Sequence, residues 1–97
     1  MAVSTIKNPI IFVDGDYAES ATVNVSNYGK ATTTINLHLD GYKLIGITRL
    51  QPSSAATVGV IGYNIDPATE VLTVYVYGLV SGTATAKVAT RGLYVKI

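Results

Sequence analysis

Few residues of this 97-residue chain could take part in chemistry, and they do not form a catalytic set. His38 is the only histidine, and Asp40 lies two residues further on, so both side chains could project from one face of a strand. A nucleophilic mechanism would also need an activated hydroxyl, and no serine stands in a Gly-x-Ser-x-Gly turn. We therefore expect His38 to be a strand histidine that faces solvent or an interface, and we predict no catalytic residue.

A short acidic stretch offers the best oxygen ligands for a metal ion. Asp14, Asp16 and Glu19 offer hard oxygen ligands that could hold Ca²⁺, but the twelve-residue calcium loop is missing. Asp is also common in turns, where it accepts local backbone hydrogen bonds. A glycosidase would need two carboxylates across a groove, and pairing Glu19 with Glu70 would be arbitrary. The sequence thus predicts a turn at Asp14–Asp16, with no metal, no cofactor and no enzyme activity.

Tyrosine is the most informative residue type, because the chain has seven Tyr against one Phe and no Trp. Tyr suits surfaces that are partly dry and partly wet. Four tyrosines fall in predicted strands and are our candidate interface or ligand contacts: Tyr63, Tyr75, Tyr77 and Tyr94. Two interpretations remain open, since they could pack at a subunit interface or could stack on a sugar ring or touch a receptor.

Charge and cysteine content exclude several classes of function. The formal net charge is +1, which is too balanced for a protein that binds nucleic acid by neutralising phosphates. The chain has no Cys and therefore no disulfide or sulfur-ligated zinc. No apolar run approaches the length of a membrane span, and no export signal or anchor is recognisable. Charged residues make up only 13% of the chain, so we expect part of its surface to be buried in a homo-oligomer.

The elements that must carry these residues are strands. Val, Ile and Thr make up 33 of the 97 residues, and all three favour pleated sheets. Apolar and polar residues alternate in a series of short segments about ten residues apart, which is typical of an antiparallel sandwich. We predict an all-β fold, a single antiparallel β-sandwich or jelly-roll-like domain of seven or eight short strands over residues 10–97. It follows a short N-terminal arm, residues 1–9, which could add a strand to a partner.

Two connections need particular turns or bulges. Asp66-Pro67 has the residues of a type I turn and should join two antiparallel strands, 57–64 and 71–77. In the last segment, 83–97, the apolar residues lie at even positions up to Val88 and at odd positions from Leu93 onward. A bulge near Arg91-Gly92 would return both sets to one face.

The order of the predicted strands and turns along the chain resembles one family. The segment Gly41-Tyr42-Lys43-Leu44-Ile45-Gly46-Ile47, a Ser/Ala loop, a hairpin rich in Val and Tyr, and the ending Leu93-Tyr94-Val95-Lys96 are similar to small β domains of phage virion proteins. These are tail-fibre or receptor-binding tips, head fibres and capsid decoration proteins. The resemblance spans residues 23–97 and implies a homotrimer on the virion, assembled in the host cytoplasm, that contacts other virion proteins, a host glycan or a receptor. The alternative from another class is a carbohydrate-binding module, with Tyr63, Tyr75 and Tyr77 on an exposed platform.

Overall fold

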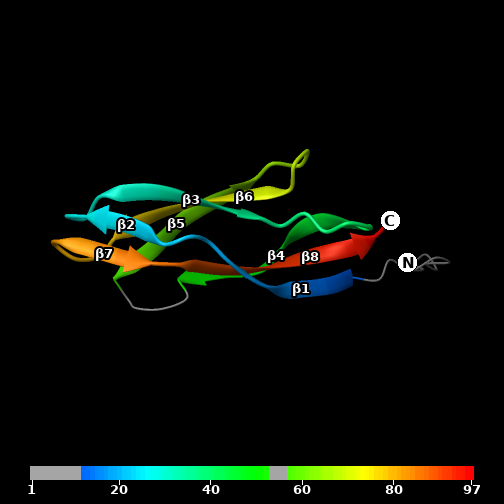
Figure 1. Ribbon diagram of the computed structural model, residues 1–97, viewed down its shortest axis with the longest axis horizontal. Helices are drawn as coiled ribbons and strands as arrows, with labels where there is room; N and C mark the ends of the chain where they lie inside the picture. Colours follow the sequence, from blue (N-terminus) through cyan, green and yellow to red (C-terminus); the bar gives the residue numbers. More distant parts are fainter. Residues whose placement is uncertain (1–11, 53–56) are drawn as a thin grey trace, which may run out of the picture.

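The computed structural model describes residues 12–52 and 57–97, and this part of the chain contains eight strands and no helix (Figure 1). The predicted arm, residues 1–9, lies outside the described residues, as does most of the predicted Ser/Ala loop. None of the described segments is a helix that could cross a membrane. The strands are β1 (Phe12–Glu19), β2 (Val23–Ser26), β3 (Lys30–Asn36), β4 (Tyr42–Pro52), β5 (Val58–Ile65), β6 (Val71–Gly78), β7 (Thr83–Ala86) and β8 (Val88–Lys96).

The strands pair in a nested order, and every pair is antiparallel. The first strand pairs with the last, β2 with β7, and β3 with β6. The chain is therefore folded back on itself as one long double ribbon, the arrangement of a jelly roll. The sheets are β1-β8-β4, β2-β7 and β3-β6-β5. Figure 1 shows β2-β7 continuing the ribbon of β1 and β8, so one layer of the sandwich holds these strands and the other holds β3-β6-β5.

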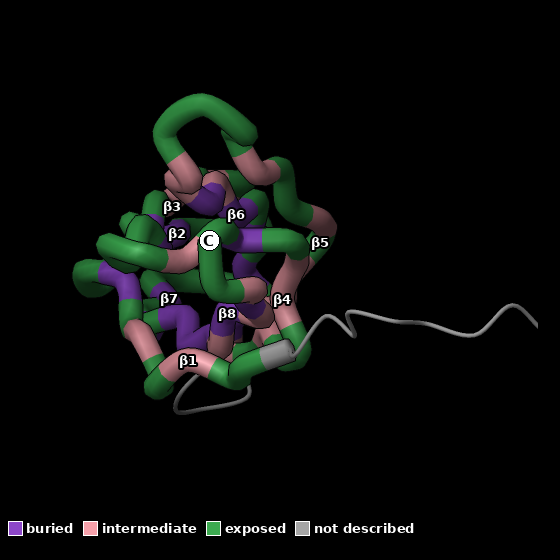
Figure 2. The backbone as a smooth tube through the Cα atoms, turned by 90° about the vertical axis from the view of Figure 1, so that its right-hand side faces the viewer, coloured by how far each residue is buried: buried purple, intermediate pink, exposed green. Residues whose placement is uncertain are grey.

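The core lies between the two layers, where Figure 2 shows the buried segments gathered. Alternation in the sequence produces it, because successive residues of a strand point to opposite faces. On β6 the buried residues are Leu72, Val74 and Val76, each 0% exposed. Val88 and Thr90 of β8 face them from the other layer and are equally buried. The all-β sandwich predicted from the sequence is confirmed.

The turns carry backbone conformations that their residues rarely adopt. Asn27 and Tyr28 both have positive φ, 50° and 58°, and Gly29 N–H donates to Ser26 O at 2.9 Å. This is a tight two-residue turn, and it joins β2 in one layer to β3 in the other, where the two strands pair with β7 and β6. In the β5–β6 turn the carboxylate of Asp66 accepts the Ala68 N–H at 2.8 Å. The antiparallel hairpin predicted at Asp66-Pro67 is present.

The last strand differs from our prediction. It is regular through Arg91-Gly92, and its even-numbered residues stay on the core face as far as Tyr94, so Tyr94 is buried and Leu93 and Val95 are not. A Cβ on Gly92 would lie 2.7 Å from Cε1 of Tyr94, so the missing side chain makes room for the ring. The bulges lie instead in the neighbouring strands, in β1 and β4.

The acidic stretch also differs from our prediction. Asp14 and Asp16 lie within β1, which runs on to Glu19, and not in a turn that ends a short strand. The pairing of β1 with β8 shifts by one residue between Asp14 and Tyr17. A bulge has replaced the turn, because β8 offers partners to the strand on both sides of it.

Candidate functional site

The four candidate tyrosines do not meet at one site. Tyr75 and Tyr77 project from the outer face of β6, and they are 42% and 38% exposed. Tyr63 is opposite the buried Val74 in the β5–β6 register, so it points to the other side of the sheet and is exposed at the open edge. Tyr94 is 5% exposed and belongs to the core, which corrects our expectation of a surface contact.

A bulge in β5 separates Tyr63 from the other two exposed tyrosines. Val60 is opposite Val76, and the register then shifts by one residue so that Gly62 is opposite Tyr75. If the register of Val60 continued without this shift, Ile61 would be opposite Tyr75 and Tyr63 opposite Thr73, so both would point outward. A simple alternation of apolar and polar residues does not encode a bulge, so the division of the predicted platform of Tyr63, Tyr75 and Tyr77 could not be read from the sequence.

A different exposed surface forms around the two outer tyrosines, and we call it the tyrosine patch: Ile61, Tyr75, Tyr77 and Leu79. Ile61 is 53% exposed and Leu79 is 41% exposed. A Cβ on Gly59 would lie 3.0 Å from Cε1 of Tyr77 and 3.5 Å from Cδ2 of Leu79, so these two side chains cover Gly59. Beside Tyr75, a Cβ on Gly62 would meet nothing within 4 Å. Sequence reasoning missed Ile61, Leu79 and the two glycines.

The tyrosine patch has almost no charge around it. The three strands of its sheet carry one charged residue, Lys30, which is opposite Tyr77 at the start of β3. The other outward residues of β3 are neutral and polar: Thr32, Thr34 and Asn36. An apolar surface with a neutral hydroxyl rim resembles the centre of protein interfaces, where charged residues are depleted.

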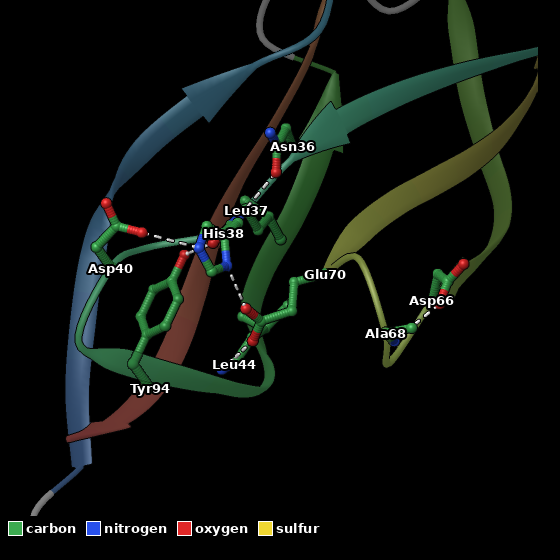
Figure 3. A network of polar contacts seen from close by, with 9 residues as sticks. All are labelled: Asn36, Leu37, His38, Asp40, Leu44, Asp66, Ala68, Glu70 and Tyr94. Carbon is green, nitrogen blue, oxygen red and sulfur yellow. Dashed lines mark hydrogen bonds and ion pairs between the residues drawn. The ribbon is translucent and has the colours of Figure 1, made fainter. Parts of the chain in front are cut away.

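His38 forms the most connected polar network of the described residues (Figure 3). Its Nδ1 is 2.7 Å from Oε1 of Glu70, and its Nε2 is 3.0 Å from Oδ1 of Asp40. The second oxygen of Glu70 accepts the backbone N–H of Leu44 at 2.5 Å. The network therefore joins the β3–β4 connection, the β5–β6 turn and β4, which belong to different layers.

The charges of this network stabilise one another. The hydrogen bond to Glu70, and then the one to Asp40, raises the pKa of His38 above its ordinary value. The hydrogen bond from His38, and then the one from Leu44, lowers the pKa of Glu70. Glu70 holds a positive φ of 60°, where glycine is favoured. The two contacts of its carboxylate, to His38 and Leu44, explain why a glutamate is found there. Sequence reasoning had placed Asp40, but not Glu70, beside His38.

The network has the features of a structural contact between layers. Both ring nitrogens of His38 face carboxylates, those of Glu70 and Asp40, and among the described residues no serine or threonine hydroxyl is hydrogen-bonded to the ring. Grooves of about 310 and 350 Å³ flank His38, and Asp14, Asp16, Tyr42 and Tyr94 line the first of them. No group of three His, Asp or Glu residues in the described segments is placed to hold a metal ion.

Tyr94 also bonds across the molecule. Its hydroxyl donates to the carbonyl of Leu37 at 2.5 Å, and its ring meets that of Tyr42 edge to face at 6.5 Å. Burial raises the pKa of this hydroxyl. Tyr94 thus acts as a core residue that fixes the segment leading to His38.

Comparison with known proteins adds no family: no family model, curated protein or solved structure matches this chain.

Proposed function

We propose that this chain is a non-enzymatic structural protein of a phage virion, a small β-sandwich that associates as a homotrimer through the tyrosine patch. It would form a fibre tip or a capsid decoration and would contact other virion proteins or a host surface. The observation that supports this proposal most is the tyrosine patch, a half-exposed aromatic and aliphatic surface in a sheet with one charged residue.

The occupant we propose for the patch is a second copy of the chain. Apolar surface rimmed by polar residues favours association, and Tyr is enriched at such contacts. Lys30 is the one charged residue of the sheet, so the rim offers little that would select a charged partner, and two copies of this surface can meet with little repulsion. A symmetric oligomer would also cover β5, an edge strand with no charged residue to protect it. The number three and the location on the virion follow from the family resemblance.

A carbohydrate-binding module is the second candidate. The bare backbone at Gly62 leaves open space beside Tyr75, where a sugar ring could stack. Tyr63 cannot contribute to the same platform, since it points to the other side of the sheet. This leaves fewer aromatic contacts than the sequence suggested.

The solution mass of the purified chain tests the proposal. Light scattering coupled to size exclusion, over about a hundredfold range of concentration, should give the mass of three 10.2 kDa chains. A monomer at every concentration would overturn association and favour the carbohydrate-binding candidate. An antibody against the chain should label intact particles of the phage that encodes it, and unlabelled particles would overturn the virion assignment.

A further inference from the structure

Two arginines and a tyrosine meet on the outer face of the β1-β8-β4 sheet, away from the tyrosine patch. Tyr17 of β1 and Arg49 of β4 are both opposite Arg91 of β8 in the register. The guanidinium of Arg91 lies 4.2 Å from the centre of the Tyr17 ring, and that of Arg49 lies 5.7 Å from it. Nη1 of Arg49 donates to the Tyr17 hydroxyl at 2.6 Å. We call these three residues the arginine cluster.

Two bulges create the arginine cluster. If β1 kept the register of its first residues, Asp16 and not Tyr17 would be opposite Arg91. If β4 kept the register of Gly46 and Ile47, Thr48 and not Arg49 would be there. Each bulge therefore exchanges a neighbour of Arg91, and one of them removes a carboxylate that would have paired with it. Bulges of this kind often re-aim side chains beside functional sites.

The positive charge of the cluster is not neutralised within the described segments. Neither guanidinium has a carboxylate within 4.0 Å in that part of the chain, where the ion pairs involve His38. Nε of Arg91 is shielded from solvent and has no hydrogen-bond acceptor among the described residues. Like charges directly opposite each other destabilise a sheet, so the pair has a cost that the ring of Tyr17 offsets only in part.

We propose that the arginine cluster binds the carboxylate of an acidic saccharide, such as a uronic acid. A guanidinium presents a planar fork that matches the two oxygens of a carboxylate, and two forks with the Tyr17 hydroxyl converge here. Tyr17 is 50% exposed, so its ring offers an apolar surface next to the charges. The site would hold one carboxylate of a saccharide whose other sugar units are neutral.

The surroundings of the cluster favour a saccharide over a polyanion. Asp14 and Glu19 are exposed on the same face of β1, and Asp16 is exposed in its bulge. These carboxylates would repel nucleic acid or a peptide with several acidic residues, whereas a ligand with a single charge can avoid them. The formal net charge of +1 gives no long-range attraction for a polyanion. This inference does not depend on self-association, because the tyrosine patch lies on the opposite sheet.

Nuclear magnetic resonance of the ¹⁵N-labelled chain can test the site directly. The methyl glycoside of glucuronate should shift the arginine Nε–Hε signals with saturation in about the millimolar range, and methyl glucoside should not. Arg49→Gln should weaken the binding about tenfold. Lys30→Gln, which removes the same charge from the other sheet, should change it less than about twofold.

A second variant protects the test against a loss of folding. Tyr17→Phe keeps both arginines and the ring, removes only the hydroxyl, and should weaken binding about threefold. The backbone spectrum shows whether each variant is folded. Absence of saturable shifts with glucuronate would overturn the proposal, as would equal binding of the neutral glycoside. Equal or tighter binding of inorganic sulfate or hexaglutamate would overturn the assignment to a saccharide.

Discussion

The outer faces of the two layers differ in the charge that their strands carry. The strands β3, β5 and β6 have one charged residue, Lys30, while β1, β4 and β8 have seven: Asp14, Asp16, Glu19, Lys43, Arg49, Arg91 and Lys96. Both faces expose tyrosine, but Tyr75 and Tyr77 stand among neutral residues and Tyr17 stands between arginines. The same side chain is therefore suited to a dry contact on one face and to a polar ligand on the other.

A charge placed in the tyrosine patch should have the largest effect of these changes, a loss of self-association. Tyr75→Lys would put an ammonium group at the centre of the proposed contact, where burying an unpaired charge is costly. We expect the association to weaken about a hundredfold or more, measured by light scattering over a range of concentrations. The matched control is Gln51→Lys, which adds the same charge to the outer face of the other layer.

If Tyr75→Lys associates as strongly as the wild type, the tyrosine patch is not the surface through which the chain associates. Loss of association in Gln51→Lys alone would place the contact on the β1-β8-β4 sheet. Both variants change exposed residues, so their folding should be close to that of the wild type.

Loss of the hydroxyl from a buried tyrosine should have the next largest effect, a decrease in the free energy of unfolding that an exposed tyrosine does not show. Tyr94→Phe removes a donor from the buried carbonyl of Leu37 and should lower the free energy of unfolding by about 1–2 kcal/mol. Tyr75→Phe, on the outer face, should change it by less than about 0.5 kcal/mol in the monomer. Urea denaturation of both variants measures the difference. Equal effects would mean that the hydrogen bond of Tyr94 to Leu37 stabilises the fold no more than hydration of the same hydroxyl stabilises the unfolded chain.

A substitution in the turn between β2 and β3 should have a smaller effect on the free energy of unfolding. Tyr28 is 63% exposed and holds a φ of 58°, which costs a residue with a side chain more than it costs glycine. Tyr28→Gly should therefore stabilise the fold by about 0.5–1 kcal/mol in urea denaturation. A loss of stability would show that the ring of Tyr28 makes a contact worth more than the strain.

The contact between layers at His38 should give a pH dependence. The raised pKa of His38 means that its contribution is complete below about pH 6.5 and is lost as pH rises through the folded-state pKa. The lowered pKa of Glu70 means that its contribution is complete above about pH 4.5 and is lost as pH falls through the folded-state pKa. The pair should stabilise the fold most between these values.

Urea denaturation of the wild type and His38→Gln checks this expectation. The difference in unfolding free energy should be larger near about pH 5.5 than near about pH 9. Asp40→Asn is the control, since Asp40 is fully exposed and should change the profile less. A constant difference across this range would contradict a charged pair.

The sequence by itself determined the class of the fold and most of the strands. Alternation of apolar and polar residues placed strands close to β2 through β6, because this period is a local property of the chain. The Asp66-Pro67 turn was equally readable, since its residues favour one backbone geometry. The contact of His38 with Asp40 was also expected, but both residues lie in the connection between β3 and β4 and not in the predicted strand.

Only the tertiary structure decided which side chains meet. Bulges in β1, β4 and β5 shift the register by one residue, and each shift moves later side chains to the other face. They separate Tyr63 from Tyr75 and bring Tyr17 and Arg49 to Arg91. Glu70 reaches His38 across 32 residues of sequence, a pairing that depends on how the layers stack. Alternation within a strand carries no information about the partner strand, so these contacts could not be read from the sequence.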